Sequence, residues 1–296
     1  MKGASLLSEA KIEAGEPADA EKPQKQGTDW WGEAKGIFWL ILAVLGFHSF
    51  IAKPFYIPSE SMMPALLVGD RLVVSKYPYG WSFVSPTFHL LPYMEGRLLG
   101  RLPERGDIVI VSPPGVKTDY IKRVIGLPGD RIEIRGGTVI LNGTPVRRQP
   151  AAPRLIPVDA NAPCSERQFP GRLVVGPDGG EYCELPIVRE TLPNGVSYDT
   201  IELGQSPGDD FAAFTVGEDH VFLMGDNRDR SADSRFSLAD GGLGGAVPWE
   251  NLGGRAEFIT FSLDGTAELF NPLSWFEALR GGRAGTSLHP DSGDAQ

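Results

Sequence analysis

Residues 133–146, EIRGGTVILNGTPV, hold two glycine-containing turn sequences separated by a short apolar run. Gly136-Gly137 and Asn142-Gly143 are two-residue sequences that favour the tight turns joining antiparallel strands. The four residues between them are rich in β-branched side chains, which are typical of strands. This stretch therefore predicts consecutive β-hairpins and favours an antiparallel β fold.

Similar short strand signals lie on both sides of these hairpins. Turn residues recur at short intervals, and the chain has 37 Gly and 25 Pro, which favours an all-β sandwich or barrel over a helical bundle. Two Pro/Gly-rich stretches, 150–171 and 203–217, are predicted to be surface insertions. The predicted strands are RLVVSK (71–76), DIVIVS (107–112), YIKRVIGL (120–127), RIEI (131–134), RLVV (172–175), HVFLMGD (220–226) and AEFITFSL (256–263).

One long apolar run precedes the strands. Residues 36–52, GIFWLILAVLGFHSFIA, contain no Asp, Glu, Lys or Arg, and their number is near the lower limit of about 17 to 25 that span a bilayer. A core helix would show a polar stripe, which this run lacks. A cleavable signal is disfavoured because a long polar tail comes first. We therefore expect a transmembrane anchor over residues 36–53.

The anchor divides the chain into unequal parts. Residues 1–35 are mostly polar and are predicted to be a disordered tail. The β-rich domain is expected over residues 54–280, followed by a flexible tail over 281–296. Lysines near the anchor are biased toward its N-terminal side, which favours a cytoplasmic N-terminus and places the β domain across the membrane.

Several features exclude or leave open other properties. A formal charge of −10 argues against a nucleic-acid partner, and the chain has no Gly-rich cofactor fingerprint. Cys164 and Cys183 fit no zinc pattern; they would be free thiols in a reducing compartment, and they could form a disulfide in an oxidising one. The apolar residues 81–94 are equally compatible with membrane contact and with the core.

The stretch YIPSESMMPALLVGD, residues 56–70, follows the predicted anchor and places Ser59 and Ser61 between two prolines. Serines in such turns usually hydrogen-bond their own backbone. A nucleophilic serine would need a base from another part of the chain.

The sequence offers two kinds of base. A Ser-His-Asp site is disfavoured because no Gly-x-Ser-x-Gly elbow occurs. A neutral lysine is the alternative if burial lowers its pKa from about 10.4. Lys122 lies on an apolar strand and shares a face with Tyr120 and Val124, although a strand lysine more often reaches solvent. The histidines are His48 in the predicted anchor, His89 in the apolar loop, His220 at a strand start and His289 in the predicted tail.

Four segments follow one another in the order and form of the sequence boxes of bacterial type I signal peptidases: PSESMMPALLVGD, RGDIVIV, YIKRVIGLPGDRI and GDNRDRSADSR. The chain resembles this family of membrane-anchored Ser-Lys proteases over the anchor and roughly residues 54–262. The resemblance implies a mostly β, antiparallel, barrel-like catalytic domain after one transmembrane helix. It also implies cleavage of N-terminal signal peptides from exported preproteins, with no cofactor or metal.

Carried over position by position, the resemblance implies that Ser61 is the nucleophile and Lys122 the general base. Ser59 matches a hydroxyl that lines the oxyanion hole beside the backbone N–H of Ser61, and Ser231 matches a serine that orients the lysine. Supporting positions are Asp233 and Arg235, with Asp226, Asn227 and Arg228 at the start of the last box. The chain departs from the family pattern at Ala65, where threonine is frequent, and at Arg230, where asparagine is usual.

The family resemblance also implies a location, the bacterial inner membrane, with the β domain on the periplasmic side. Two other functions remain open. One is a dedicated maturation protease of the same family that acts on a single substrate. The other is a catalytically silent, membrane-tethered β domain, which the presence of both Ser61 and Lys122 disfavours.

Overall fold

The computed structural model describes residues 29–86, 91–116 and 118–292. Its first element is helix α1, Trp30–Phe50, which has 21 residues and is long and apolar enough to cross a membrane. A helix of this length measures about 30 Å, which matches the hydrocarbon core of a bilayer. The helix begins before the predicted anchor and ends before Lys53, which belongs to the first strand.

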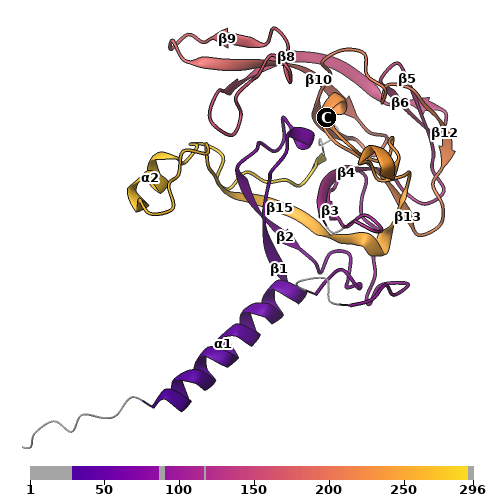
Figure 1. Ribbon diagram of the computed structural model, residues 1–296. Helices are drawn as coiled ribbons and strands as arrows, with labels where there is room; N and C mark the ends of the chain where they lie inside the picture. Colours follow the sequence, from indigo (N-terminus) through magenta and orange to yellow (C-terminus); the bar gives the residue numbers. More distant parts are fainter. Residues whose placement is uncertain (1–28, 87–90, 117, 293–296) are drawn as a thin grey trace, which may run out of the picture. The chain divides into compact units, whose positions relative to one another are not determined.

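The two hairpins predicted from residues 133–146 are present. Strand β5, Arg131–Arg135, pairs with β6, Thr138–Leu141, which pairs in turn with β7, Thr144–Pro145. Both turns have two successive residues with positive φ, at Gly136-Gly137 and Asn142-Gly143, as the turn sequences require. Strand β12, Phe211–Thr215, completes this four-stranded sheet on the other side of β5 (Figure 1).

A seven-stranded antiparallel sheet contains or adjoins the segments of the four sequence boxes. Its strand order is β1-β2-β15-β3-β4-β13-β14, so the first strands pair with a strand near the end of the chain. The apolar faces of these strands form buried clusters that contain Ile57, Leu72, Ile110 and Ile121. The bounds are β1 Ala52–Tyr56, β2 Asp70–Ser75, β3 Ile108–Val111, β4 Tyr120–Gly126, β13 His220–Met224, β14 Val247–Pro248 and β15 Leu252–Ser262. The predicted mostly β, antiparallel fold is confirmed.

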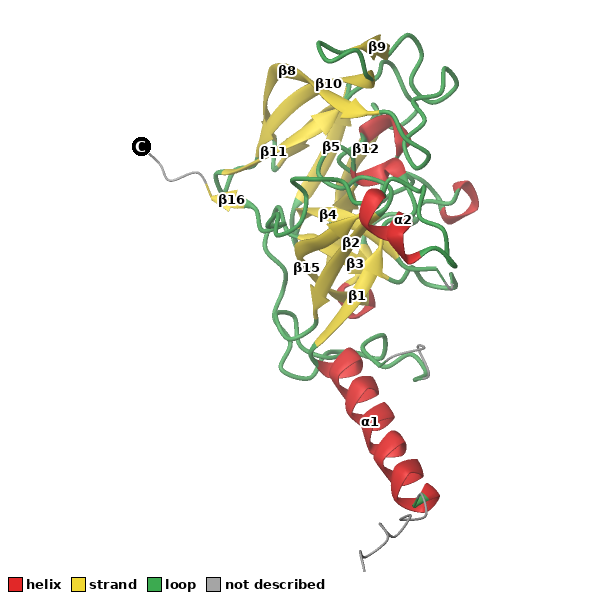
Figure 2. Ribbon diagram, turned by 90° about the vertical axis from the view of Figure 1, so that its left-hand side faces the viewer, coloured by secondary structure: helices red, strands yellow, loops and turns green. Residues whose placement is uncertain are grey.

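A third sheet includes part of residues 150–171, the stretch predicted to be a surface insertion. Residues 150–157 belong to strand β8, Arg147–Pro157, which is mostly exposed and pairs with β10, Glu181–Thr191. The other members of the sheet are β9, Leu173–Val175, β11, Val196–Ile201, and β16, Asp291–Ser292 (Figure 2). The second expected insertion, 203–217, likewise contains a strand, β12. Cross-strand pairing organises both stretches despite their glycines and prolines.

Part of the predicted flexible tail, residues 281–296, contacts the β domain. Arg283 forms an ion pair with the buried Asp70, Leu288 is buried, and β16 pairs with β11. These contacts hold residues 281–292 on the domain because they bury an apolar side chain and satisfy backbone groups. Residues 293–296 lie outside the described part.

The apolar stretch 81–94 is partly buried and partly exposed. Val84 and Ser85 are buried, whereas Leu91, Tyr93 and Met94 are exposed. The core alternative therefore holds for Val84 and Ser85, and membrane contact by the exposed residues stays a prediction. His89 lies outside the described residues, as does the predicted disordered tail up to residue 28.

Candidate active site

Ser61 lies on a short 3₁₀ turn, η1, Glu60–Met62, that follows β1. The turn is packed against the core, because the side chains of Ile57 and Met62 are almost fully buried. Ser61 is itself buried, whereas Ser59 is exposed. The two serine hydroxyl oxygens are 3.4 Å apart. The turn thus buries the Ser61 hydroxyl and places the Ser59 hydroxyl beside it at the surface.

Lys122 comes from β4 in the middle of the seven-stranded sheet and is 4% exposed. Its Nζ donates to Ser61 Oγ at 2.9 Å and to the carbonyl oxygen of Ile121 at 3.0 Å. It also lies 5.5 Å from the ring centroid of Tyr120, a predicted neighbour on its face. The structure therefore brings together two residues that are 61 positions apart in the sequence.

The Lys122 ammonium lies in surroundings that favour its neutral form. Burial lowers its pKa from 10.5 to about 8, although the carboxylates of Asp233 and Asp226 act in the opposite direction. Desolvation dominates because a buried charge loses most of its hydration energy. A neutral amine can accept a proton, so this lysine can serve as a base near neutral pH.

The neighbouring Arg123 is accommodated differently. Its guanidinium makes two hydrogen bonds to the Asp226 carboxylate, at 2.7 and 2.6 Å, and a third to the carbonyl oxygen of Gly106. This bidentate pairing keeps Arg123 charged within the protein. Asp226 belongs to the last sequence box, so the pair joins that box to β4.

The last box approaches Ser61 through its backbone. The N–H of Asn227 donates to the carbonyl oxygen of Ser61 at 3.1 Å. A Cβ atom on Gly225 would lie 2.4 Å from that same carbonyl oxygen and 2.2 Å from Ser231 Oγ. Glycine is therefore required at position 225 by the close approach of two chain segments.

Asp233 and Arg235 form the expected pair beside the site, with Arg235 Nε 2.9 Å from Asp233 Oδ1. Burial would raise the pKa of the Asp233 carboxyl, but Arg235 and the backbone N–H of Gly225 lower it overall. The hydrogen bond expected between Ser231 and Lys122 is not among the contacts of the described residues. The Ser231 hydroxyl instead lies against Gly225, within the loop that binds Ser61.

A groove of about 300 Å³ opens above Ser61 and Lys122. Its walls are mainly apolar side chains, and its polar groups are few and close to the two candidate residues. Such a combination is typical of a ligand-binding site. The lining includes Phe55, Ile57, Pro58, Ser59, Ser61, Ile110, Tyr120, Ile121, Lys122, Arg230 and Ala232.

The other candidate bases lie elsewhere. His220 Nδ1 contacts the carbonyl oxygen of Glu218, and His289 contacts the Glu257 carboxylate. His48 is in α1. Among the described residues, no histidine is hydrogen-bonded to Ser61, whereas Lys122 is.

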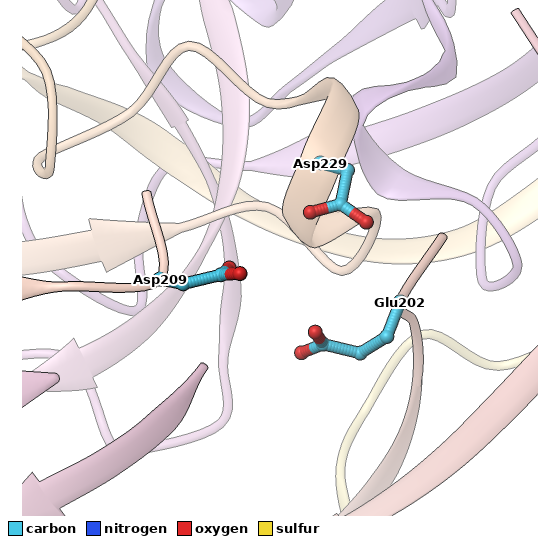
Figure 3. Close-up of side chains that lie close together, drawn as sticks. All are labelled: Glu202, Asp209 and Asp229. Atoms are coloured by element: carbon cyan, nitrogen blue, oxygen red, sulfur yellow. The ribbon is translucent and has the colours of Figure 1, made fainter. Parts of the chain in front are cut away.

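A separate cluster of carboxylates is the one place in the described ranges where acidic groups lie close enough to share a cation. Glu202, Asp209 and Asp229 point toward one another, with oxygens within 4.8 Å (Figure 3). Each already has a partner: Arg148, Ser206 and the backbone N–H of Leu203, respectively. Burial raises the pKa of Glu202 to about 7. The cluster is thus tied to neighbouring groups and is separate from the predicted site.

Cys164 and Cys183 are joined in a disulfide, with their Cα atoms 5.5 Å apart. Of the two states that the sequence left open, free thiols and a disulfide, the structure has the disulfide.

Other contacts around the site have no local sequence signal. Gln168 Nε2 donates to Glu60 Oε1 at 2.7 Å, and Arg228 binds the buried Glu190 with two hydrogen bonds.

Comparisons with known proteins agree with these features. The family model described as "Signal peptidase, peptidase S26" matches residues 30–261. Signal peptidase I of Rickettsia typhi (strain ATCC VR-144 / Wilmington) is 33% identical over 268 residues, covering 84% of this chain and 90% of that protein. Signal peptidase I of Rickettsia bellii (strain OSU 85-389) is 32% identical over 275 residues, covering 87% and 85%.

Among solved structures, a signal peptidase I from Enterococcus faecalis V583 is similar, with 23% identity and a TM-score of 0.27. The match covers 52% of this chain and 97% of that one. Family membership rests on the sequence matches, which extend over most of the chain. The chain belongs to the signal peptidase family, peptidase S26.

Proposed function

We propose that this protein is a membrane-bound serine endopeptidase that removes N-terminal signal peptides from exported preproteins. Ser61 is the nucleophile and Lys122 the general base. The observation that carries the proposal is the 2.9 Å contact between Lys122 Nζ and Ser61 Oγ, in surroundings that lower the lysine pKa to about 8. A nucleophile hydrogen-bonded to a base is what acyl transfer by a serine requires.

Neutral Lys122 takes the Ser61 proton as Oγ attacks the carbonyl carbon of the scissile peptide bond. The resulting tetrahedral oxyanion collapses, and the lysine gives that proton to the leaving amine. Lys122 next takes a proton from water as the water oxygen attacks the acyl-enzyme carbonyl carbon. The bond between that carbon and Ser61 Oγ then breaks, Lys122 returns the proton to Oγ, and the signal peptide leaves with a new carboxylate. The Ile121 carbonyl oxygen also accepts a hydrogen bond from the lysine, which fixes its amine beside Ser61 throughout.

The Ser59 hydroxyl and the backbone N–H of Ser61 are the proposed donors to the oxyanion. Support comes from the 3.4 Å separation of the two serine oxygens and from the buried turn below them. One oxyanion donor is worth roughly 3 to 4 kcal/mol in other serine proteases. Ser231, Asp233 and Arg235 support the site by maintaining the loop that binds the Ser61 carbonyl.

The proposed location is the bacterial inner membrane, with one transmembrane helix and the catalytic domain on the periplasmic side. The disulfide supports the oxidising side, because disulfides persist in oxidising compartments. A lipid bilayer as partner is supported by exposed apolar residues around α2, Pro272–Glu277, where Phe270 is 94% exposed. Exposed apolar side chains gathered in one segment favour a site of interaction. Its members are Leu269, Phe270, Leu273 and Phe276.

The test is cleavage of a signal-bearing precursor by the full chain in detergent, with products identified by mass spectrometry. Wild-type protein should release one N-terminal fragment, and Ser61→Ala should release none. Ser287→Ala, which removes an exposed hydroxyl far along the chain, is the matched control and should cleave normally. Equal cleavage by Ser61→Ala and wild type would exclude the proposed nucleophile.

A further inference from the structure

A short segment that the family boxes do not include reaches the residue next to the nucleophile. Residues 164–172, here called the arm, begin at the disulfide to Cys183 on β10. Phe169 of the arm is buried in a cluster with Met63, the residue that follows η1. The arm is thus fixed at its start by a covalent bond and in its middle by apolar packing.

Within the arm, Gln168 is part of a chain of three hydrogen-bonding side chains. Ser165 Oγ donates to Gln168 Oε1, and Gln168 Nε2 donates to Glu60 Oε1 at 2.7 Å. The first bond uses the amide oxygen and therefore directs the amide NH₂ at Glu60. A hydrogen bond to a carboxylate is stronger than one between neutral groups.

Arg230 fixes the arm from the other side. Its guanidinium donates to the carbonyl oxygens of Arg167 and Gln168 and lies 5.9 Å from the ring centroid of Phe169. Arg230 stands where the family usually has asparagine, and it also lines the groove above Ser61. Its charge acts on Glu60 and opposes the effect of burial on that carboxyl.

Glu60 is the first residue of η1, and its carbonyl oxygen accepts from the N–H of Met63, which closes the turn that carries Ser61. A bond to the Glu60 side chain therefore restrains the turn from outside. We propose that Gln168 is a positioning residue, which through Glu60 holds the Ser61 turn in register with Lys122. This inference rests on the proposed function of Ser61.

The hydrogen bond can be broken and restored by exchanging its two ends. Gln168→Glu places a carboxylate against Glu60 and removes the donor. The double variant Glu60→Gln, Gln168→Glu keeps the net charge, and the amide at position 60 can donate to the new carboxylate, which still accepts from Ser165. Gln168→Leu removes the donor without adding charge. Gln149→Glu, at an exposed position on β8, is the matched control for the added charge.

The full chain in detergent is assayed on one signal-bearing precursor, with thermal midpoints measured in parallel. We expect kcat to fall about tenfold or more in Gln168→Glu and Gln168→Leu, because small displacements of a nucleophile are costly. KM should remain within about twofold, since Gln168 does not itself line the groove. The double variant should recover most of the lost kcat, and Gln149→Glu should equal wild type.

Wild-type kcat in Gln168→Leu, or a loss in Gln168→Glu that the double variant does not recover, would overturn the inference. The Ser61→Ala variant separates this failure from failure of the proposed function. If Ser61→Ala is inactive while Gln168→Leu is fully active, only the positioning role is wrong. If Ser61→Ala cleaves the precursor, the proposed function is wrong as well.

Discussion

The backbone N–H of Asn227 donates to the carbonyl oxygen of Ser61 at 3.1 Å, so the main chain of the last sequence box binds the turn that carries the proposed nucleophile. The approach depends on Gly225, where a Cβ would lie 2.4 Å from the same oxygen. We expect Gly225→Ala to displace the turn and to lower kcat at least tenfold. Gly217→Ala is the control, because its Cβ would meet its nearest neighbour at an ordinary 3.5 Å. Wild-type kcat in Gly225→Ala would show that the close approach does not position Ser61.

Replacement of Ser59 should be less damaging than replacement of Ser61. Ser59→Ala removes one oxyanion donor and leaves the backbone N–H of Ser61, so a loss of about 10² to 10³ in kcat is expected. Ser61→Ala should leave no measurable turnover. Single-turnover cleavage of a precursor by both variants measures the difference. Equal losses would mean that Ser59 has a role other than oxyanion stabilisation.

The buried lysine should lower the stability of the folded protein. Folded Lys122 releases its proton near pH 8, whereas an unfolded lysine does so near 10.5. Between these values the unfolded state binds more protons, so the contribution of Lys122 to stability increases as pH rises. At pH 7 the cost is roughly 3 kcal/mol.

Lys122→Met should therefore be inactive and yet more resistant to denaturant at pH 7. The gain should shrink as the pH is raised toward 10.5. Urea unfolding curves for wild type and Lys122→Met at a series of pH values measure this. A variant that is less stable than wild type at pH 7 would contradict a desolvated lysine.

The disulfide should stabilise the fold through the unfolded state. Cys164 and Cys183 are 19 positions apart, and closing a loop of about this size contributes roughly 3 kcal/mol in the chain-entropy model. Reductant should lower the free energy of unfolding of wild type by about that amount. It should have no effect on the double variant Cys164→Ser, Cys183→Ser, which serves as control. Equal stability with and without reductant would mean that the bond is absent or without consequence.

Local signals were sufficient for much of the fold. The turn pairs at Gly136-Gly137 and Asn142-Gly143 gave the hairpins, and β-branched runs gave strands of the central sheet. The β10–β11 hairpin is absent from the predicted strands, although Asn194-Gly195 between its two strands is a hairpin signal. Strand β8 was masked by its prolines. They are tolerated because β8 is at the edge of its sheet, where some N–H groups need no partner.

The candidate site likewise has residues that the sequence predicts and contacts that it does not. Ser61 and Lys122 could be selected because a nucleophile needs a base and a buried lysine can act as one. Their contact, at 2.9 Å, depends on a strand pairing that no local pattern specifies. The contacts of Gln168 with Glu60 and of Arg123 with Asp226 join distant segments. Contacts of this kind are fixed by tertiary packing, so a single sequence does not reveal them.

The pH dependence of cleavage tests the central claim, that neutral Lys122 activates Ser61. The chain offers a discriminating control, because burial also lowers the pKa of Lys76 to about 8, and Lys76 donates to the carbonyl oxygen of Ser85 instead of to a serine hydroxyl. We predict that kcat/KM rises with pH along a single limb with its midpoint near 8, in wild type and in Lys76→Met alike. A midpoint near 10.4, or a limb that disappears in Lys76→Met, would contradict Lys122 as the base.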